Sequence, residues 1–456
     1  MAPCRNRVRV VSSNRSVFVQ NGIMATAAPI KNSVKTCEVW RIMTTLGQTA
    51  SYPTSCNFNM IAIPLHSQPL CVDYYTIVNP YIIYQPMHIF KNLVPQHQER
   101  IIGLDILRSI AILIVVYAHG SNLIPKRYHG FYFKFLVIDG VSLFFVLSGF
   151  LIGGILLKII TQTNFTKTDV LNFWIRRWFR TIPNYFLVLF GVLAYNIYQT
   201  RSVGNFNLTY LIFSQNFSSP HPNFFGEAWS LTIEEWFYLF FPLSCYVFHT
   251  FLKNKTRSIL FSALIFLLFP LIIRIIKFEH GIGINDIDGE FRKIMILRLD
   301  SIMYGVVAAY ILFKQPVFWV KYKYYFLALG IFLLIDPLHF KGYYTPLYFN
   351  IESIITFCFL PFLSSFKTTK IKALDGFFIF ISVISYSMYL LNYSAVQLVI
   401  MPILHRLLRM PNLPIEDVYV QNYCLYWFLT IFCSYFLYRM FENPMTKLRD
   451  KIHVSG

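Results

Sequence analysis

Long apolar segments follow one another along the chain from residue 101 almost to its end. A segment of about 20 apolar residues is long enough to cross the roughly 30 Å hydrocarbon layer of a bilayer as a helix. About ten such segments can be drawn on this criterion, at 102–120, 135–157, 182–199, 229–251, 258–276, 295–314, 324–340, 347–365, 377–402 and 420–441. The pattern predicts an all-α fold, a polytopic bundle of about ten transmembrane helices.

The composition supports a membrane protein and excludes an ordinary soluble domain. Hydrophobic residues make up 56% of the 456 residues, charged residues only 13%, and the mean hydropathy is +0.51. The formal net charge of +19 could suggest a nucleic-acid partner, but no basic face with stacking aromatic residues is visible. About twice as many Lys and Arg fall on one side of the predicted spans as on the other, which places both ends of the membrane core in the cytoplasm. We expect no nucleic-acid partner and an integral, multi-pass location.

Residues 1–86 differ from the rest of the chain. They contain Cys4, Cys37, Cys56 and Cys71, and neither helical nor strand periodicity continues through them. Two interpretations fit: a disordered cytoplasmic tail, or upstream sequence read from a start codon set too early, with the protein beginning at Met87. We favour the second and expect no packed domain in this segment. Residues 87–456 are expected to form one membrane domain.

The first apolar segment carries three ionisable residues, Asp105, Arg108 and His119. On a helix, Arg108 and His119 share one face and lie roughly 16 Å apart along the axis. Ionisable groups within a membrane span are costly, so a polar face of this kind indicates a site or pathway inside the bundle. The alternative is structural: Asp105 and Arg108 could form an ion pair that only fixes the bundle.

Asp139 lies near the start of the next apolar segment, on the same side of the membrane as His119. A carboxylate beside a histidine fixes its tautomer and raises its basicity, so we expect Asp139 to support His119 as a general base. Ser148 and Gly149, farther along this segment, are expected to allow close helix packing.

Three arginines, Arg176, Arg177 and Arg180, precede the third segment. The spacing of Arg177 and Arg180 puts both guanidinium groups on one side of a helix, where they could bind phosphate oxygens. A basic belt that attracts anionic lipid headgroups is the alternative.

Acidic residues also occur in later segments. Glu234 and Glu235 lie a helical turn or more inside an apolar segment that begins near Trp229, and at that depth a carboxylate needs a partner or a wet cavity. Trp229 could be only an interfacial anchor. Arg274 could extend to the nearby interface, as long basic side chains do.

Taken together, these residues resemble the acyltransferase 3 family of integral membrane acyltransferases, which O-acetylate bacterial surface polysaccharides. The resemblance covers about 101–448 and rests on the order and spacing of separate motifs, namely Arg108 with His119, Asp139-Gly140, Ser148-Gly149-Phe150, Arg177 with Arg180, Glu227-Ala-Trp229-Ser230-Leu231 with Glu234-Glu235, and Glu442-Asn443-Pro444. One departure is Asn392, where family members often carry His.

The resemblance implies transfer of an acyl group, usually acetyl, from cytoplasmic acyl-CoA to a hydroxyl of a glycan across the membrane. Arg177 and Arg180, with Arg176, would hold the CoA phosphates. Arg108 would position the pantetheine end or the thioester carbonyl. His119, supported by Asp139, would take the proton of the attacking hydroxyl. Further residues would bind the acceptor, namely Glu234, Glu235, Trp229 and Asn392. The resemblance implies no metal, a location in the bacterial inner membrane, and glycan-assembly proteins as further partners.

Two other classes of function fit a polar path through a helix bundle. A transporter or flippase of a lipid-linked sugar or small solute is one, although no internal repeat is visible. A receptor or scaffold without catalysis is the other. Consumption of acyl-CoA would separate both from an acyltransferase.

Overall fold

The computed structural model describes residues 100–132, 138–162, 165–252, 254–282, 286–335, 345–408 and 415–449, and the backbone of three short strands near the N-terminus. The chain divides into two units, Met1–Cys71 and Val72–Gly456. In the first unit, β1 (Val8–Ser12), β2 (Arg15–Gln20) and β3 (Ile23–Ala27) form an antiparallel sheet in the order β1-β2-β3. The sequence pattern did not predict these strands. The four cysteines and Met87 lie outside the described residues, and the origin of this segment stays a prediction.

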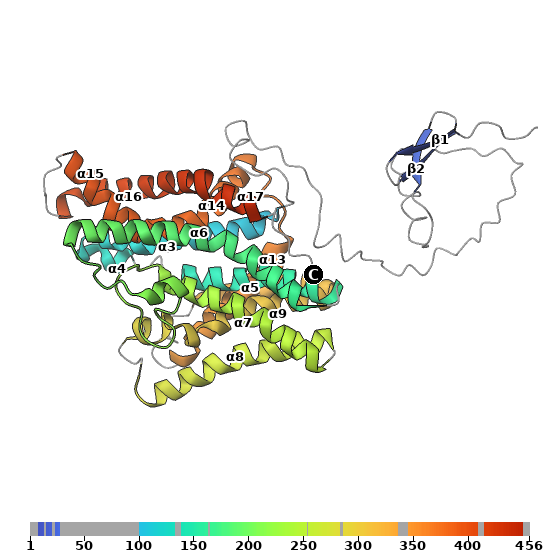
Figure 1. Ribbon diagram of the computed structural model, residues 1–456, viewed down its shortest axis with the longest axis horizontal. Coiled ribbons are helices and arrows are strands. Elements are labelled where there is room, and N and C mark those ends of the chain that lie inside the picture. Colours follow the sequence, from blue (N-terminus) through green and yellow to red (C-terminus); the bar gives the residue numbers. More distant parts are fainter. Residues whose placement is uncertain are drawn as a thin grey trace, which may run out of the picture. The chain divides into compact units, whose positions relative to one another are not determined.

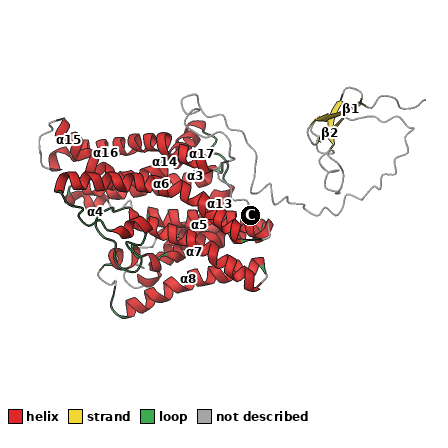
Figure 2. Ribbon diagram, viewed as in Figure 1, coloured by secondary structure: helices red, strands yellow, loops and turns green. Residues whose placement is uncertain are grey.

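The described secondary structure of the second unit is entirely helical (Figure 2). Its α-helices are α3 (Ile102–Gly120), α4 (His129–Tyr132), α5 (Gly140–Gln162), α6 (Lys167–Thr200), α7 (Ala228–Leu252), α8 (Lys255–Glu279), α9 (Leu299–Lys314), α10 (Pro316–Lys321), α11 (Lys323–Ile335), α13 (Tyr348–Ser365), α14 (Lys372–Leu391), α15 (Met401–Leu407), α16 (Ile415–Leu437) and α17 (Asn443–Arg449). Short 3-10 and π-helical segments connect them, namely η1 (Ser121–Leu123), η2 (Lys126–Tyr128), η4 (Leu208–Ile212), η5 (Asp288–Arg292), η6 (Met295–Leu297), η7 (Thr345–Leu347), η8 (Asn392–Ile400) and η9 (Tyr438–Glu442).

The long helices run side by side in a bundle, with α8 along one edge and α16 near the opposite edge (Figure 1). Seven segments of the described helices are long and apolar enough to cross a membrane. The other three predicted windows fall on α7, on α9 with 16 residues, and on α11 with 13 residues. The expected all-α, polytopic bundle is therefore confirmed for this unit.

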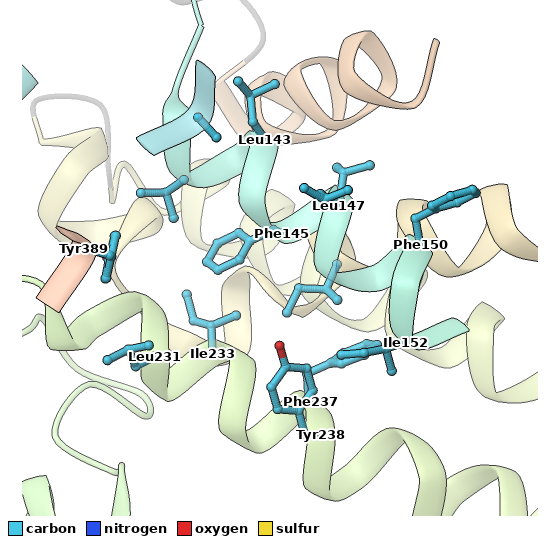
Figure 3. Close-up of a cluster of buried hydrophobic side chains, with 14 of the residues drawn as sticks. Leu143, Phe145, Leu147, Phe150, Ile152, Leu231, Ile233, Phe237, Tyr238 and Tyr389 are labelled. Carbon is cyan, nitrogen blue, oxygen red and sulfur yellow. The ribbon is translucent and has the colours of Figure 1, made fainter. Parts of the chain in front are cut away.

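The helices α5 and α9 cross with their backbones in contact, and glycine makes this crossing possible. A Cβ atom at Gly149 would lie 1.8 Å from the carbonyl oxygen of Ile302, and one at Gly305 would lie 1.9 Å from that of Val146. Small residues at such positions let two helix backbones touch within a membrane. The packing role expected for Gly149 is therefore confirmed. Beside this crossing, large apolar side chains of α5 and α7 fill the core (Figure 3).

α8 presents apolar side chains outward, including Leu264, Leu268 and Ile272, as a lipid-facing helix does. Its inward face carries Arg274, which is fully buried and binds Asp300 of α9 through two hydrogen bonds, of 3.1 Å and 2.5 Å. The expectation that Arg274 extends to the interface is wrong, because an acidic partner is available inside the bundle. This ion pair joins α8 to α9.

Candidate functional site

A pocket opens inside the bundle between α3, α5, α6, α7 and α14. Three of its lining residues are Arg108, Arg177 and Arg180, which come from two helices far apart in the sequence. Phe144 and Phe145 of α5 are among the apolar residues on another wall. The pocket thus combines cationic groups with an apolar surface, as a site for an anionic molecule with a hydrocarbon or acyl part requires.

Arg108 and Arg180 have no hydrogen bond or ion pair from their guanidinium groups to any residue that the structure describes. Asp105, the expected partner of Arg108, instead accepts a 2.5 Å hydrogen bond from Ser382 of α14 and lies 3.9 Å from Arg100. The alternative in which Asp105 and Arg108 form a structural ion pair is therefore contradicted. Two guanidinium groups without a bound carboxylate leave the pocket able to accept an external anion.

The sequence predicted a loop before residue 182, but α6 already begins at Lys167. Its first turn is closed by a capping box, in which Thr166 and Asp169 bind each other's backbone N–H groups. Arg177 and Arg180 therefore lie on one face of a helix, as their spacing requires, and both line the pocket. Arg176 is exposed and does not line it, because one residue step turns an α-helix by about 100°. The grouping of Arg176 with the other two is not supported by this geometry.

The two adjacent glutamates occupy different surroundings. Glu234 lines the pocket, where Ser148 donates to it at 3.1 Å and the Tyr238 hydroxyl at 3.0 Å. Glu235 is buried outside the pocket lining and accepts a 2.6 Å hydrogen bond from Thr181 of α6. Of the two predicted substrate-binding glutamates, the structure thus places only Glu234 where a ligand could contact it.

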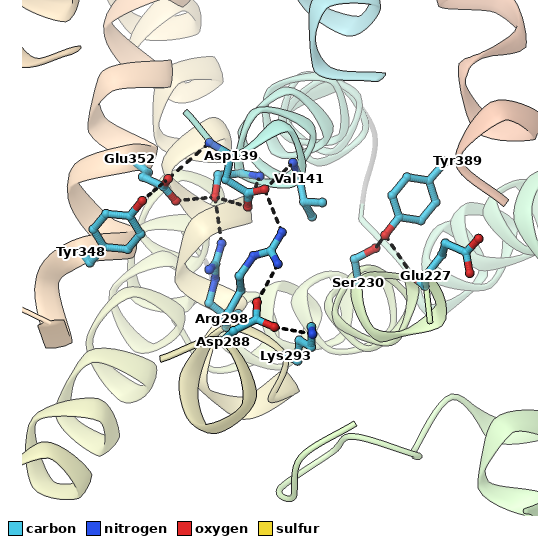
Figure 4. A network of polar contacts seen from close by, with 12 residues as sticks. Asp139, Val141, Glu227, Ser230, Asp288, Lys293, Arg298, Tyr348, Glu352 and Tyr389 are labelled. Atoms are coloured by element: carbon cyan, nitrogen blue, oxygen red, sulfur yellow. Dashed lines mark hydrogen bonds and ion pairs between the residues drawn. The ribbon is translucent and has the colours of Figure 1, made fainter. Parts of the chain in front are cut away.

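Asp139 belongs to a cluster of charged side chains at the beginning of α5 (Figure 4). It forms an ion pair with Arg292 at 2.9 Å, and Ser142 lies 3.0 Å from it. Ser142 also donates to Glu352 of α13 at 2.8 Å and accepts from Arg298 at 3.0 Å. Burial raises the pKa of Asp139, but the nearby Arg292 and Arg298 lower it more, so that the net pKa lies below its usual value.

The expected contact between Asp139 and His119 is not formed. The Nδ1 atom of His119 lies 2.5 Å from the Oδ1 atom of Asn392, at the start of η8, while Asp139 is bound by Arg292. The error arose because topology gave only the depth of each side chain, and an arginine 153 residues away competes for the carboxylate. The role of His119 as a general base stays a prediction.

Asn392 and Trp229 lie inside the protein rather than on the pocket wall. Asn392 is fully buried, and its amide binds His119, Met388 and Tyr389, so this geometry does not support a hydrogen bond to an acceptor sugar, which stays a prediction. Trp229 is 4% exposed and lies beneath the guanidinium of Arg292, 4.8 Å from its ring centroid. It is not among the pocket's lining residues, so its predicted contact with substrate is not supported.

Several residues of the site escaped the sequence analysis. Glu352 is a lone acid in a predicted span and could have been found by that feature alone. Tyr389 lines the pocket, donates to the backbone oxygen of Glu227 at 3.0 Å and lies 2.5 Å from the Ser230 hydroxyl. Tyrosines are common in this chain, so nothing in the sequence distinguished Tyr389 from the others.

Comparison with known families assigns this core. A family model described as an acyltransferase domain, that of the acyltransferase 3 family, matches residues 101–439, which is most of the chain. The chain belongs to this family. Its bundle is therefore an integral, multi-pass acyltransferase domain, and the resemblance drawn from the motifs is confirmed.

Relatives match over part of their length. O-acetyltransferase OatA of Staphylococcus aureus (strain NCTC 8325 / PS 47) is 27% identical over 242 residues, covering 49% of this chain and 36% of that protein. Peptidoglycan O-acetyltransferase OatA of Listeria monocytogenes is 32% identical over 175 residues, 33% of this chain and 25% of that protein. YrhL of Bacillus subtilis is 32% identical over 179 residues, 36% of this chain and 26% of that protein. The chain thus spans about a quarter to a third of these proteins, and no solved structure matches it.

Proposed function

We propose that this protein transfers an acyl group, acetyl in the first instance, from acyl-CoA to a hydroxyl of a cell-surface glycan such as peptidoglycan. The observation that carries the proposal is the pocket in which Arg108, Arg177 and Arg180 meet beside apolar side chains. Acyl-CoA has phosphate groups that could bind the arginines and an acyl thioester that could contact the apolar side chains. The names of the OatA relatives support an O-linked acetyl product and a glycan acceptor.

Arg177 and Arg180 would bind the phosphates of the donor, since planar guanidinium groups pair with phosphate oxygens. Arg108, in the same pocket, would position the pantetheine end of the donor through hydrogen bonds from its guanidinium group. His119 lies eleven residues farther along α3, roughly 16 Å away along the axis. An extended donor molecule can bridge this separation.

In the proposed reaction, the acceptor hydroxyl oxygen attacks the thioester carbon while His119 takes the hydroxyl proton. The bond between this carbon and sulfur then breaks, the new ester forms, and the CoA sulfur receives a proton. No covalent acyl-enzyme intermediate is needed. The predicted topology places the donor arginines on the cytoplasmic side and His119 toward the opposite side. Because the donor is cytoplasmic and the glycan lies outside the cell, the proposed location is the bacterial plasma membrane.

The test is transfer by His119→Ala. We expect a loss of about 100-fold or more, because general base catalysis contributes on that order. Membranes from cells with and without each variant are given labelled acetyl-CoA, and O-acetyl groups on the surface glycan are measured by mass spectrometry. His280→Ala is the matched control, because His280 is exposed at the end of α8.

Full transfer by His119→Ala, with equal protein in the membrane, would remove His119 as the base. If the wild-type protein consumes no acetyl-CoA but changes the distribution of a lipid-linked sugar, the transporter interpretation replaces the proposal.

A further inference from the structure

The side-chain amide of Asn392 is held in one orientation. Asn392 stands where α14 passes into the π-helix η8, and its Nδ2 atom donates to the backbone oxygens of Met388 at 2.9 Å and Tyr389 at 2.8 Å. Rotating the amide by 180° would bring its oxygen against these two carbonyl oxygens, which cannot donate. The Oδ1 atom therefore points away from the helix, toward His119.

The start of η8 is itself anchored. The carboxylate of Glu227, which precedes α7, accepts hydrogen bonds from the backbone N–H groups of Tyr393 at 3.0 Å and Ser394 at 2.7 Å. These two residues follow Asn392 directly. Because α7 lines the pocket, the position of Asn392 is tied to the pocket wall.

This orientation determines the protonation pattern of the His119 ring. An amide oxygen only accepts, so at 2.5 Å the Nδ1 atom of His119 must be the donor and must carry a hydrogen. Tyr426 lies 3.4 Å from the same oxygen, but its hydroxyl has a nearer acceptor in the Val116 carbonyl at 2.9 Å. In a neutral ring with Nδ1–H, the Nε2 atom holds the free lone pair. No described residue forms a hydrogen bond with Nε2.

We infer that Asn392 is a positioning residue that fixes the neutral Nδ1–H tautomer of His119 and leaves Nε2 as the proton acceptor for the glycan hydroxyl. The inference rests on the proposed function for its chemistry, whereas the tautomer follows from the contacts alone. An amide, unlike a carboxylate, adds no negative charge beside the ring. The charged side chains that act electrostatically on the His119 ring are Arg292, Lys293 and Asp139, and the Tyr393 ring lies 5.3 Å from it.

The kinetic test compares Asn392→Leu and Asn392→Asp with the wild type in labelled acetyl transfer. Asn392→Leu removes the acceptor, so the ring loses both its fixed tautomer and its fixed orientation. The loss of this one hydrogen bond should lower kcat by about tenfold, with KM for acetyl-CoA changed less than twofold. Asn392→Asp keeps a hydrogen-bond acceptor for Nδ1–H, so at high pH its kcat should be close to that of the wild type. Because its carboxylate stabilises the protonated ring, the acid limb of the pH–rate profile should move upward by about one pH unit or more.

Gln397→Leu is the matched control, because Gln397 donates to the backbone oxygen of His119 at 2.9 Å and does not bind the ring. It should leave the pH–rate profile in place. Unchanged kcat in Asn392→Leu, or an unshifted profile in Asn392→Asp, would overturn the inference. Elution of each variant as a single species on size exclusion shows that it is folded.

A second readout does not depend on acyl transfer. ¹⁵N spectra of histidine-labelled protein, with His119→Gln to assign the resonance, should show a protonated Nδ1 and an unprotonated Nε2 at neutral pH. The opposite tautomer would overturn the inference even if the enzyme is active, and the expected tautomer in a protein without acyl transfer would reject only the proposed function.

Discussion

Gly149→Ala is the substitution for which the structure gives the clearest expectation. A Cβ atom at this position would lie 1.8 Å from the Ile302 carbonyl oxygen and 3.2 Å from the Cα of Gly305. Both neighbours are backbone atoms, so no side chain can rotate away. The axes of α5 and α9 must instead separate locally by about 1 Å or more, since a carbon cannot approach an oxygen so closely.

This separation should be expensive. A gap of about 0.5–1 Å removes a quarter to a half of the dispersion energy of each atom pair across an interface. Overpacked sites in well-packed proteins lose about 1–3 kcal/mol, and a contact between two backbones belongs at the upper end of that range. For a chain of 456 residues the apparent Tm should fall by roughly 3–4 °C.

The measurement is thermal unfolding in one detergent, followed by tryptophan fluorescence. Gly154→Ala is the matched control, because Gly154 is on the same helix, is exposed, and a Cβ there would meet no atom within 4 Å. It should keep or slightly raise Tm, since Ala favours a helix over Gly by about 1 kcal/mol. Equal Tm values for the two variants would refute the account of this crossing.

Two further predictions concern charged groups. Arg177→Ala with Arg180→Ala should raise KM for acetyl-CoA about tenfold or more, because each lost charge-assisted hydrogen bond is worth roughly 1.5–3 kcal/mol. Arg176→Ala, which removes one positive charge outside the pocket, should leave KM within about twofold of the wild type; a rise in KM for Arg176→Ala comparable to that of the double variant would support the lipid-belt alternative. Asp300→Leu should destabilise the bundle by about 3–5 kcal/mol in thermal unfolding, because the fully buried Arg274 loses the carboxylate that balances its charge. Adding Arg274→Met should recover most of this loss, and a double variant no more stable than Asp300→Leu would contradict the explanation.

Hydrophobic patterning was sufficient for the elements whose ends coincide with a change of polarity. The window at 102–120 is α3 nearly residue for residue, because apolar and polar segments meet at both ends. α6 was predicted too short, since its first turns carry Asp169 and the arginines and have no apolar stretch. The capping residues Thr166 and Asp169 were the only local indication that the helix begins earlier.

The sequence predicted which residues belong to the site better than it predicted which of them contact each other. Arg108, Arg177 and Arg180 meet in the pocket because helical spacing and depth determine where they point. The partner of His119 could not be found in this way, since Asn392 is 273 residues away and its orientation depends on a π-helix. Periodicity reports which face a residue occupies, but not which of several polar groups at the same depth will bind it.

The backbone contact between α5 and α9 also limits how the pocket can change shape. The backbones of these two helices are in contact at Gly149 and Gly305, so we expect little movement of one relative to the other. A change of pocket shape that admits a donor or releases a product is therefore expected to involve the other lining helices, such as α6 and α14. These two helices are joined by a hydrogen bond from the Tyr386 hydroxyl to the Thr181 carbonyl oxygen, at 2.8 Å.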